Sequence, residues 1–556
     1  MDIPIYNLPH STLRPHQSET IEWLLNQSST SILSAPTGSG KSAYVKAVSS
    51  QRKTFVLTRT KSLQYANYDR TYGMDTLYGK SNYECCHPDN SGNSANLCLY
   101  ADLGMHKCSH ASDCSYLIAK GKVVNSNQVS LNYSYWLTAQ RGWLKEGMPE
   151  VLFLDECHLL PSLVRDWAGC TVDEQERQRW NLPDFPILNQ GRTSSNSGLQ
   201  LFSPVSSQQI KSNPVDEAIC WLEECLVILR KKIIELGNEV KRDRTDDKKL
   251  KGLFHACESL GMKLRGCLES LEANPTDWYI KSGFNVFERK FKGRADLVSG
   301  FLCKPLTAKY HFPRLFLKPN VNHTVLMSAT IGKPEQFVKE LGITQYNLRL
   351  VPNVFKPEDR PVYVFKSCPK MGYEQDRNKL LAKSTQQAKL IADLILSYPP
   401  HWTGVIHVNS KDKANRLMVN LNNQGLNKRA CITPEVGTEK QLEWWNNHKK
   451  RIRGAICVAW SFAEGVDLFD DNFCISADIP FGDQGSEYGK ALFNYNIPFY
   501  MWEAAMNLEQ RSGRIRRGDV SHYGVEAEKI VAVFDGNWSR IKSYLSEDFM
   551  KSIVEV

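Results

Sequence analysis

The chain of 556 residues is predicted to be an α/β protein with two parallel-sheet lobes, the first of which carries two long insertions. Short apolar runs, typical of strands buried on both faces, alternate with helical patterns. A glycine-rich loop follows the first run, and a pair of carboxylates follows a later one. The runs lie at 31–34, 54–57, 151–154 and 324–327 in the first lobe, and at 362–365, 404–408, 455–458 and 529–534 in the second.

Composition is consistent with a large globular protein. Hydrophobic residues make up 42% of the chain, which has room for about three or four domains. The formal net charge of +9 suits a polyanionic partner, although a charge of this size is equally compatible with a role in solubility. Charge alone therefore does not decide whether the protein binds nucleic acid.

The order of the runs divides the chain into four parts. The first lobe is assigned to 1–79, 126–162 and 311–350, a cysteine-rich insert to 80–125, a helical insert to 163–310, and the second lobe to 351–556. In the helical insert, apolar residues recur every three or four positions before and after a charged turn at 241–249. This spacing predicts an antiparallel helical hairpin, whose basic turn is either a solvated face or a contact for a nucleic acid strand.

A phosphate-binding loop follows the run at 31–34. Its residues are Ala35, Pro36, Thr37, Gly38, Ser39, Gly40, Lys41 and Ser42. They match G-x-x-x-x-G-K-[ST] except at Ala35, where the pattern has a glycine. Gly38 and Gly40 let backbone N–H groups turn toward phosphates, Lys41 reaches the terminal phosphates, and Ser42 binds Mg²⁺. A glycine turn that only caps a helix would not require the strand before it and Lys-Ser after it, so ATP and Mg²⁺ are the predicted cofactors.

Two adjacent carboxylates, Asp155 and Glu156, follow the run at 151–154. At the carboxyl edge of a parallel sheet, Asp155 would hold Mg²⁺ through water and Glu156 would activate the attacking water as a general base. His158 ends the same block and is a third catalytic candidate. An isolated Asp-Glu pair is more often a turn or a helix cap. The upstream Lys41 favours the catalytic interpretation.

Five of the 16 cysteines fall within thirty residues of the first insert. They are Cys85, Cys86, Cys98, Cys108 and Cys114. Their wide, uneven spacing lacks the paired C-x₂-C motif of zinc ribbons and favours a [4Fe-4S] cluster held by Cys85, Cys98, Cys108 and Cys114. Zinc remains the alternative metal because three histidines lie in the same segment, and unligated thiols are a third reading. Only one of Cys85 and Cys86 is needed, and Cys85 is favoured.

Further short motifs follow in the second half of the chain. They are Ser328-Ala329-Thr330, the block at 462–468 that contains Glu464, Gly465 and Asp467, and the block at 510–517 that contains Gln510, Arg514 and Arg517. In this order, behind the phosphate loop, the motifs resemble superfamily 2 helicases of the DEAD/DEAH type. The cysteine-rich insert before Asp155 and the helical insert after it resemble the XPD/DinG iron–sulfur DNA helicases. The resemblance runs from about residue 14 to about residue 535.

The resemblance implies two RecA-like lobes, an iron–sulfur insert, an arch-like helical insert, and specific roles for residues. Arg14 and Gln17 would contact the adenine, and Thr58, Arg59 and Thr60 would grip the phosphates of the nucleic acid strand. Ser328 and Thr330 would couple hydrolysis to movement, while Glu464, Gly465 and Asp467 would face both nucleotide and nucleic acid. Gln510, Arg514 and Arg517 would reach the γ-phosphate across the cleft.

A physical argument independent of the resemblance also supports a catalytic role for the arginines. Charge spreads over the oxygens of the phosphoryl group during transfer, so a guanidinium supplied by the opposite lobe stabilises that charge only when the cleft closes. Without the upstream motifs, the block around Arg514 and Arg517 would be a generic basic patch.

These expectations combine into an ATP-dependent DNA helicase that moves 5′ to 3′ on single-stranded DNA, with the cluster domain helping to separate strands. Its partners would be single-stranded and forked DNA, it would act as a monomer, and replication or repair proteins are further candidates. One alternative is a translocase or an RNA helicase without DNA unwinding. Another is a non-catalytic, redox-sensing DNA-binding protein, against which the retained ATPase residues argue.

The N-terminal sequence has no basic leader followed by an apolar stretch, and no run of about 18 apolar residues occurs. We therefore expect a soluble, cytoplasmic protein without a membrane partner. In such a compartment, cysteines are reduced thiols or metal ligands rather than disulfides.

Overall fold

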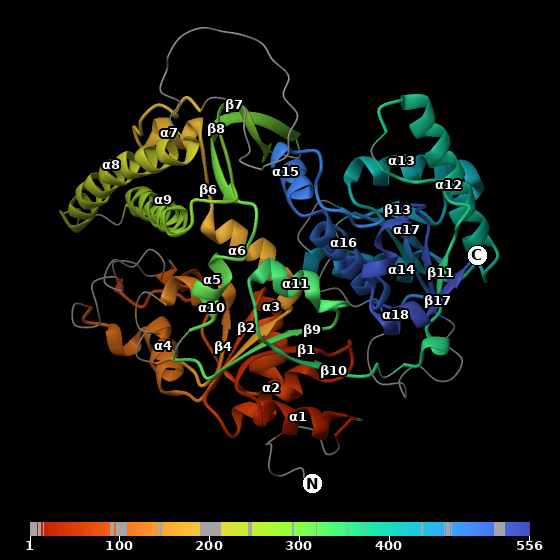
Figure 1. Cartoon of the computed structure of the whole chain (residues 1–556), viewed down its shortest axis with the longest axis horizontal. Helices are drawn as coiled ribbons and strands as arrows, with labels where there is room; N and C mark the ends of the chain where they lie inside the picture. The colour runs from red at the N-terminus through yellow and green to blue at the C-terminus, as the bar shows by residue number, and fades with distance from the viewer. Residues whose placement is uncertain are drawn as a thin grey trace.

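Two seven-stranded sheets form the framework of the protein in the computed structural model (Figure 1). The structure describes residues 8, 13–14, 16–88, 94–95, 108–140, 142, 144, 147–188, 213–242, 247–291, 294–318, 320–353, 355–372, 374–434, 438–460, 462, 468, 470–515 and 529–556. All strand pairs within these two sheets are parallel. The predicted α/β class with two parallel-sheet lobes is therefore confirmed.

The first sheet has the strand order β10-β1-β9-β5-β2-β4-β3. Its strands are β1 (Ser29–Ser34), β2 (Thr54–Thr58), β3 (Asp75–Thr76), β4 (Gln128–Asn132), β5 (Val151–Asp155), β9 (His323–Ser328) and β10 (Asn347–Leu350). Alternate residues serve two cores. Val151 and Phe153 of β5 pack in the core that includes Ile21 and Tyr44, whereas Leu152 and Leu154 pack in the core on the other face. Burial on both faces explains why these strands are continuous apolar runs.

The second sheet has the order β13-β14-β12-β15-β16-β11-β17. Its strands are β11 (Val362–Val364), β12 (Gly404–His407), β13 (Ala430–Ile432), β14 (Ile456–Ala459), β15 (Phe473–Ser476), β16 (Ile530–Val533) and β17 (Ile553–Glu555). Helices α12 (Arg377–Leu396) and α13 (Lys411–Leu421) supply buried residues to the core on one face, and α16 (Ile497–Ser512) supplies them to the other.

The remaining helices connect or cover these sheets. They are α1 (Gln17–Leu25), α2 (Lys41–Ser49), α3 (Lys61–Leu63), α4 (Ser115–Asn125), α5 (Tyr133–Ala139), α6 (Leu160–Ala168), α7 (Glu174–Arg179), α8 (Pro214–Arg242), α9 (Lys248–Ala273), α10 (His311–Phe316), α11 (Pro334–Leu341), α14 (Thr438–Arg451), α15 (Glu487–Tyr495), α17 (Trp538–Ile541) and α18 (Glu547–Lys551). Among the described helices, none combines the length and apolar character needed to cross a bilayer.

The insert after α6 contains the long helices α8 and α9, which pack together through a core of their own (Figure 1). It also contains an antiparallel sheet of β6 (Cys170–Asp173), β7 (Trp278–Phe291) and β8 (Arg294–Pro305), which the sequence analysis did not anticipate. The aromatic and β-branched residues of β7 and β8 are the signal for this hairpin. The helical pattern before it obscured that signal.

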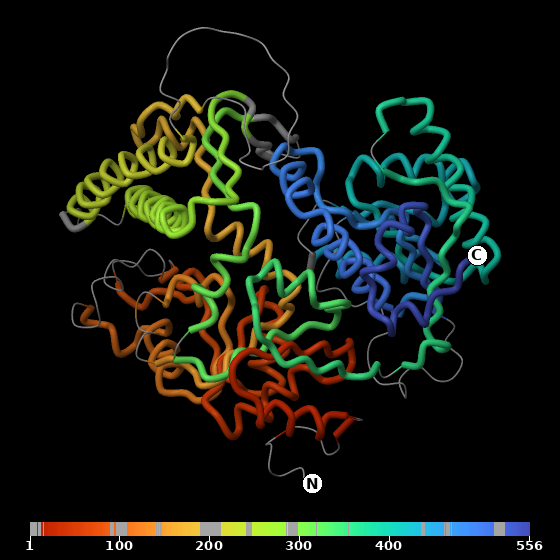
Figure 2. The backbone as a smooth tube through the Cα atoms, in the orientation of Figure 1, coloured from red at the N-terminus to blue at the C-terminus, as the bar shows by residue number. Residues whose placement is uncertain are grey.

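The course of the backbone returns distant segments to the first lobe (Figure 2). After the insert, the chain passes through α10 and places β9 between β1 and β5. The sheet therefore closes only when a segment near residue 325 pairs with strands near residues 30 and 150.

A buried ion pair between α6 and α11 is joined to the second lobe by a hydrogen bond. Arg165 Nη1 of α6 donates to Glu340 Oε1 of α11 at 2.8 Å, and both side chains are buried. Glu340 also accepts from the Ala308 N–H at 3.1 Å and from Asn496 Nδ2 at 3.4 Å. Asn496 caps α16, so the Glu340 carboxylate joins the two lobes.

We predict that Glu340→Ala will lower the free energy of unfolding by about 3–5 kcal/mol, because it leaves the Arg165 charge buried without its partner. Lys339→Ala on the same helix, where the side chain is exposed, is the matched control and should change stability by less than about 0.5 kcal/mol. Thermal and denaturant unfolding measure both. Equal stability of the two variants would contradict this role for Glu340.

Candidate active site between the lobes

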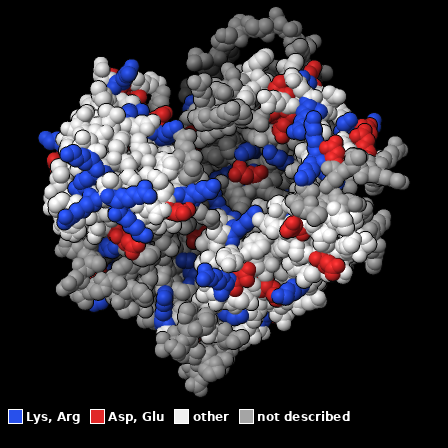
Figure 3. Space-filling model, turned by 180° about the vertical axis from the view of Figure 1, so that it is seen from behind, with Lys and Arg blue, Asp and Glu red and all other residues white. Residues whose placement is uncertain are grey.

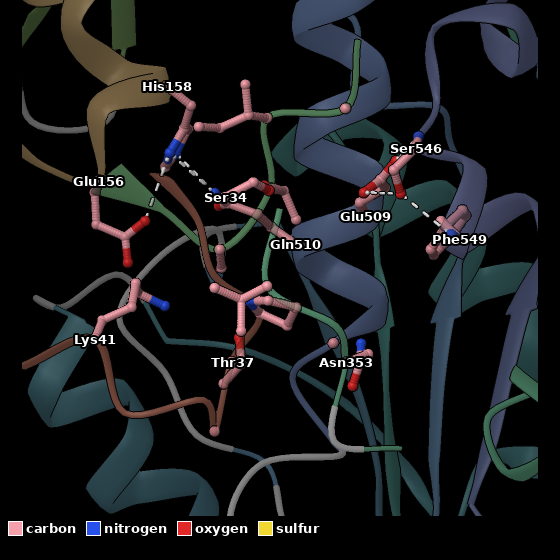
Figure 4. A pocket seen from close by; sticks show the side chains of 18 of the residues that line it. Ser34, Thr37, Lys41, Glu156, His158, Asn353, Glu509, Gln510, Ser546 and Phe549 are labelled. Atoms are coloured by element: carbon pink, nitrogen blue, oxygen red, sulfur yellow. Dashed lines mark hydrogen bonds and ion pairs between the residues drawn. The ribbon is translucent and has the colours of Figure 1, made fainter. Parts of the chain in front are cut away.

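A cavity of about 1110 Å³ lies between the two lobes (Figure 4). The first lobe lines it with Lys41, Asp155 and Glu156, and the second lobe lines it with Gln510 and Arg514. The cavity therefore brings together motifs that are more than 350 residues apart in the sequence.

The phosphate loop joins β1 to α2 and lines this cavity. Gly38 and Gly40 both have φ of 89°, the left-handed region that favours glycine. A Cβ at Gly40 would lie 2.1 Å from Gln17 Nε2, so a larger residue would displace that side chain. Lys41 Nζ lies 3.3 Å from the Ala35 carbonyl oxygen at the start of the loop. The loop and the N-terminus of α2 together form a site suited to an anion.

Gln17 and Arg14 donate hydrogen bonds to main-chain carbonyls of this loop. Gln17 Nε2 donates to the Ser39 carbonyl at 3.0 Å, and Gln17 Oε1 accepts from the Arg14 N–H at 2.8 Å. The Arg14 guanidinium donates to the Gly38 carbonyl, and Arg14 lines the cavity. Gln17 is only 5% exposed, and both ends of its amide are engaged with protein atoms. Its assignment to the adenine base stays a prediction.

Asp155 ends β5, and its side chain is buried. Burial raises the pKa of Asp155 to about 6, the neighbouring Glu156 carboxylate adds to the rise, and Lys41 opposes it. The Tyr68 hydroxyl donates to Asp155 Oδ2 at 2.9 Å, and the Tyr133 hydroxyl donates to the Asp155 main-chain oxygen at 2.7 Å. A desolvated carboxylate beside a second carboxylate is a favourable place for a cation, so Asp155 and the nearby Ser42 fit Mg²⁺.

Glu156 adopts a left-handed backbone conformation with φ of 54°. A residue other than glycine in this region carries strain that the surrounding structure must hold in place. The turn directs the Glu156 side chain toward the cavity, near Lys41 and His158 (Figure 4).

His158 links three motifs. Its Nδ1 lies 3.0 Å from Ser328 Oγ, and its Nε2 lies 2.8 Å from Gln510 Nε2 of the second lobe. The same Gln510 nitrogen lies 3.1 Å from Nδ1, and the ring tautomer sets which atom donates at each of these contacts. Glu156 Oε2 lies 3.5 Å from the same Nδ1. The ring therefore connects the general-base candidate and Ser328 to Gln510 across the cavity.

The arginines of the second lobe differ in their surroundings. Arg514 is 2% exposed and lines the cavity. Arg511 donates to Asn409 Oδ1 at 3.2 Å from both terminal nitrogens, and burial lowers the pKa of Arg511 to about 10. Arg517 lies outside the described residues, as do Glu464, Gly465 and Asp467.

The residues predicted to bind a nucleic acid strand differ in their exposure to solvent. Thr58 is fully buried, and its hydroxyl donates to the Thr60 carbonyl at 3.1 Å. Arg59 and Thr60 are exposed and line the cavity. Thr330 also lines the cavity, and its main-chain N–H donates to Ser328 Oγ at 3.3 Å. The assigned roles of all these residues stay predictions.

Four cysteines of the first insert are described, and Cys98 lies outside the described residues. Cys85 and Cys114 are buried, whereas Cys86 and Cys108 are partly exposed. Burial raises the pKa of the Cys86 thiol, and Cys114, Cys85 and Cys108 contribute to the rise. Within the described part of the chain, no group of three or more His, Cys, Asp or Glu side chains is arranged to hold a metal ion. The iron–sulfur cluster is thus a proposal rather than an observation.

Some residues that line the cavity belong to no motif that the sequence could reveal. The C-terminal segment contributes Ser546, Asp548 and Phe549, and the segment between the lobes contributes Arg360. Arg360 Nη2 donates to Asp548 Oδ2 at 2.5 Å. These residues belong to no recognisable motif, so only the folded chain reveals them.

Two parallel-sheet lobes, with a phosphate loop in the first and a cavity between them, define the fold class of the chain. A solved structure described as "XPD_Helicase" is similar to this chain, with a TM-score of 0.56, 14% sequence identity, and coverage of 98% of this chain and 100% of that one. The likeness shows that the two chains share a fold over nearly their whole length.

Two other solved helicases have lower scores. S. cerevisiae Dbp5 bound to RNA and ADP BeF3 has a TM-score of 0.39 at 12% identity, with coverage of 99% and 92%. Mycobacterium smegmatis Lhr bound to ssDNA and AMP-PNP has a TM-score of 0.36 at 11% identity, with coverage of 96% and 48%. No protein-family model and no curated protein matches the sequence.

We predict that Arg514→Ala will retain ATP binding and lower the hydrolysis rate by about 10³ to 10⁵, because an arginine acting across a cleft stabilises charge that develops only during transfer. Nucleotide binding and steady-state turnover are measured on the same preparation. Arg514→Lys keeps the charge without the planar guanidinium and should recover part of the rate. Loss of ATP binding in Arg514→Ala would show that this arginine has a different role.

Proposed function

We propose that this protein is an ATP-dependent DNA helicase that translocates on single-stranded DNA. The observation that carries the proposal is the cavity in which Lys41, Asp155 and Glu156 of one lobe face Gln510 and Arg514 of the other. The helicase fold supports the same reading. In such a cavity, one nucleotide can contact both lobes, so its binding and hydrolysis can change their separation.

Each residue of the first lobe would have a separate role in ATP hydrolysis. The phosphate loop and Lys41 would bind the β- and γ-phosphates, and Ser42 and Asp155 would hold Mg²⁺. Magnesium, when bound, neutralises charge on the phosphates. Glu156 would orient the attacking water and accept its proton.

The second lobe would complete the site only in the closed state. Arg514 is buried at the cavity wall, where water does not screen its charge strongly. Gln510 already contacts His158, which in turn contacts Ser328. A γ-phosphate that moved either lobe would therefore disturb a hydrogen-bonded chain that spans the cleft, and this provides a route from hydrolysis to movement.

The surface charge is compatible with a nucleic acid partner. Lys and Arg side chains form a band that runs across the face shown in Figure 3 toward a hollow near its centre. Contacts to phosphates should supply most of the affinity. The logarithm of the affinity for single-stranded DNA should then fall with the logarithm of salt concentration, with a slope of about −0.7 per neutralised phosphate.

The finer parts of the proposal come from the family resemblance. They are 5′ to 3′ movement, unwinding of forked DNA by a monomer, and a [4Fe-4S] cluster held by Cys85, Cys98, Cys108 and Cys114, with zinc as the alternative metal. Strand-separation assays on forked DNA and forked RNA, run beside ATPase assays, test the substrate. Hydrolysis without strand separation would indicate a translocase instead.

We predict that Lys41→Ala will abolish ATP hydrolysis stimulated by single-stranded DNA, because the variant loses the cation that reaches the terminal phosphates. Phosphate release with and without a single-stranded oligonucleotide measures this. Lys46→Ala is a control on the same helix, since the Lys46 ammonium bonds Gln128 Oε1 rather than lining the cavity. Turnover of Lys41→Ala at the wild-type rate would remove the phosphate loop from the mechanism.

We predict that Cys108→Ser and Cys114→Ser will bleach a brown, anaerobically purified protein, because a serine oxygen is a poorer iron ligand than a thiolate. Absorption spectra and metal analysis measure the loss. Cys220→Ser, at an exposed cysteine of α8, should leave the colour unchanged. A colourless wild-type protein that contains zinc would support the alternative metal.

A further inference from the structure

A fully buried tyrosine lies between the two groups assigned to magnesium. The Tyr68 hydroxyl donates to Asp155 Oδ2 at 2.9 Å. The nearby Ser42 side chain lowers the pKa of Tyr68 against the larger rise from burial, and Ser42 and Asp155 line the same cavity. Ser42 comes from the phosphate loop and Asp155 from the end of β5, so Tyr68 joins the two elements that would share the ion. No sequence motif pointed to this residue.

Tyr68 belongs to an uncommon piece of secondary structure. It lies in the π-helix η2 (Gln64–Arg70), which continues directly from α3. Such wide turns are rare and often mark functional sites. Gln64 anchors this one from the buried side, since its Nε2 donates to the Ser130 carbonyl at 2.8 Å and to the Leu77 carbonyl at 3.2 Å.

The other end of this helical segment is the predicted strand-binding segment. Thr60 caps α3 by accepting from the Leu63 N–H at 3.3 Å, and Arg59 and Thr60 are exposed. Eight positions separate Thr60 from Tyr68 along this continuous helical segment. A phosphate bound at Thr60 would therefore move or fix the same rigid segment that carries the Tyr68 hydroxyl.

A second tyrosine near Asp155 shows how a buried hydroxyl can be satisfied without contacting the carboxylate. Tyr133 is also buried, but its hydroxyl donates at 2.7 Å to the main-chain oxygen of Asp155 rather than to the carboxylate. Tyr68 instead fixes one carboxylate oxygen of Asp155. Groups that orient metal ligands in this way typically change metal affinity by about 10- to 100-fold when removed.

We propose that Tyr68 is a positioning residue that couples polynucleotide binding at Arg59 and Thr60 to the magnesium ligands Ser42 and Asp155. The proposal rests on the proposed helicase function. Strand binding fixes α3 and η2, the Tyr68 hydroxyl then holds Asp155 and Ser42 in the geometry that the ion requires, and the site binds Mg²⁺ more tightly. This provides a physical route by which a nucleic acid strand stimulates hydrolysis.

The test compares Tyr68→Phe with Tyr133→Phe. Each variant removes one buried tyrosine hydroxyl that donates to Asp155, but only the Tyr68 hydroxyl donates to the carboxylate. Mn²⁺ replaces Mg²⁺, and electron paramagnetic resonance measures its affinity for full-length protein loaded with a non-hydrolysable ATP analogue, with and without an oligodeoxythymidine. We expect the oligonucleotide to tighten Mn²⁺ binding in the wild type and in Tyr133→Phe. Tyr68→Phe should bind Mn²⁺ about 10- to 100-fold more weakly and lose the response to the oligonucleotide.

Two results would overturn the proposal. One is wild-type Mn²⁺ affinity and response in Tyr68→Phe, and the other is a wild-type protein whose Mn²⁺ affinity ignores the oligonucleotide. The second result needs no variant, so it stands even if a variant folds poorly. Stimulation of wild-type ATP hydrolysis by the same oligonucleotide is measured in parallel. Its absence would count against the proposed function, whereas its presence with an unchanged Tyr68→Phe would count against Tyr68 alone.

Discussion

The constraint on which the site depends is that parallel strands end at one edge of a sheet. Strands β1, β9, β5 and β2 are neighbours in that order, and a functional segment follows each of them. The phosphate loop follows β1, the Ser328 motif ends β9, Asp155 ends β5, and Thr58 ends β2. The contact between His158 and Ser328 at 3.0 Å follows from the adjacency of β5 and β9. Four segments scattered over three hundred residues thus meet because their strands are neighbours in one parallel sheet.

This constraint explains what the sequence could predict. The strands that were foreseen, such as β5, are buried on both faces and read as unbroken apolar runs. Strand β10 was not foreseen because its edge position leaves Leu348 and Leu350 exposed and its pattern irregular. Motif residues were found because phosphate and metal chemistry demand particular side chains. Tyr68 was missed because its role depends on a π-turn and on partners 26 and 87 residues away, which no local pattern encodes.

The fold keeps Asp155 and Glu156 adjacent although their burial and mutual repulsion disfavour two negative charges. Burial and the adjacent Glu156 both raise the pKa of Asp155, and the left-handed turn at Glu156 adds backbone strain. Lys41 and the Tyr68 hydroxyl offset part of this cost. A fold that keeps two carboxylates together at a buried strand end is more favourable once a cation arrives, so the strain is consistent with a site that is completed by its cofactors.

Side chains at both ends of α16 contact the first lobe. At its start, the Asn496 amide donates at 3.4 Å to Glu340, whose carboxylate is also paired with the buried Arg165 of α6. At the other end of α16, the Gln510 amide nitrogen lies 2.8 Å from Nε2 and 3.1 Å from Nδ1 of His158. Both contacts come from α16, whose buried residues pack in the core of the second lobe, so the helix presents them to the first lobe from one rigid element. A nucleotide that changes the separation of the lobes therefore acts on the contact between Gln510 and His158, both of which line the cavity.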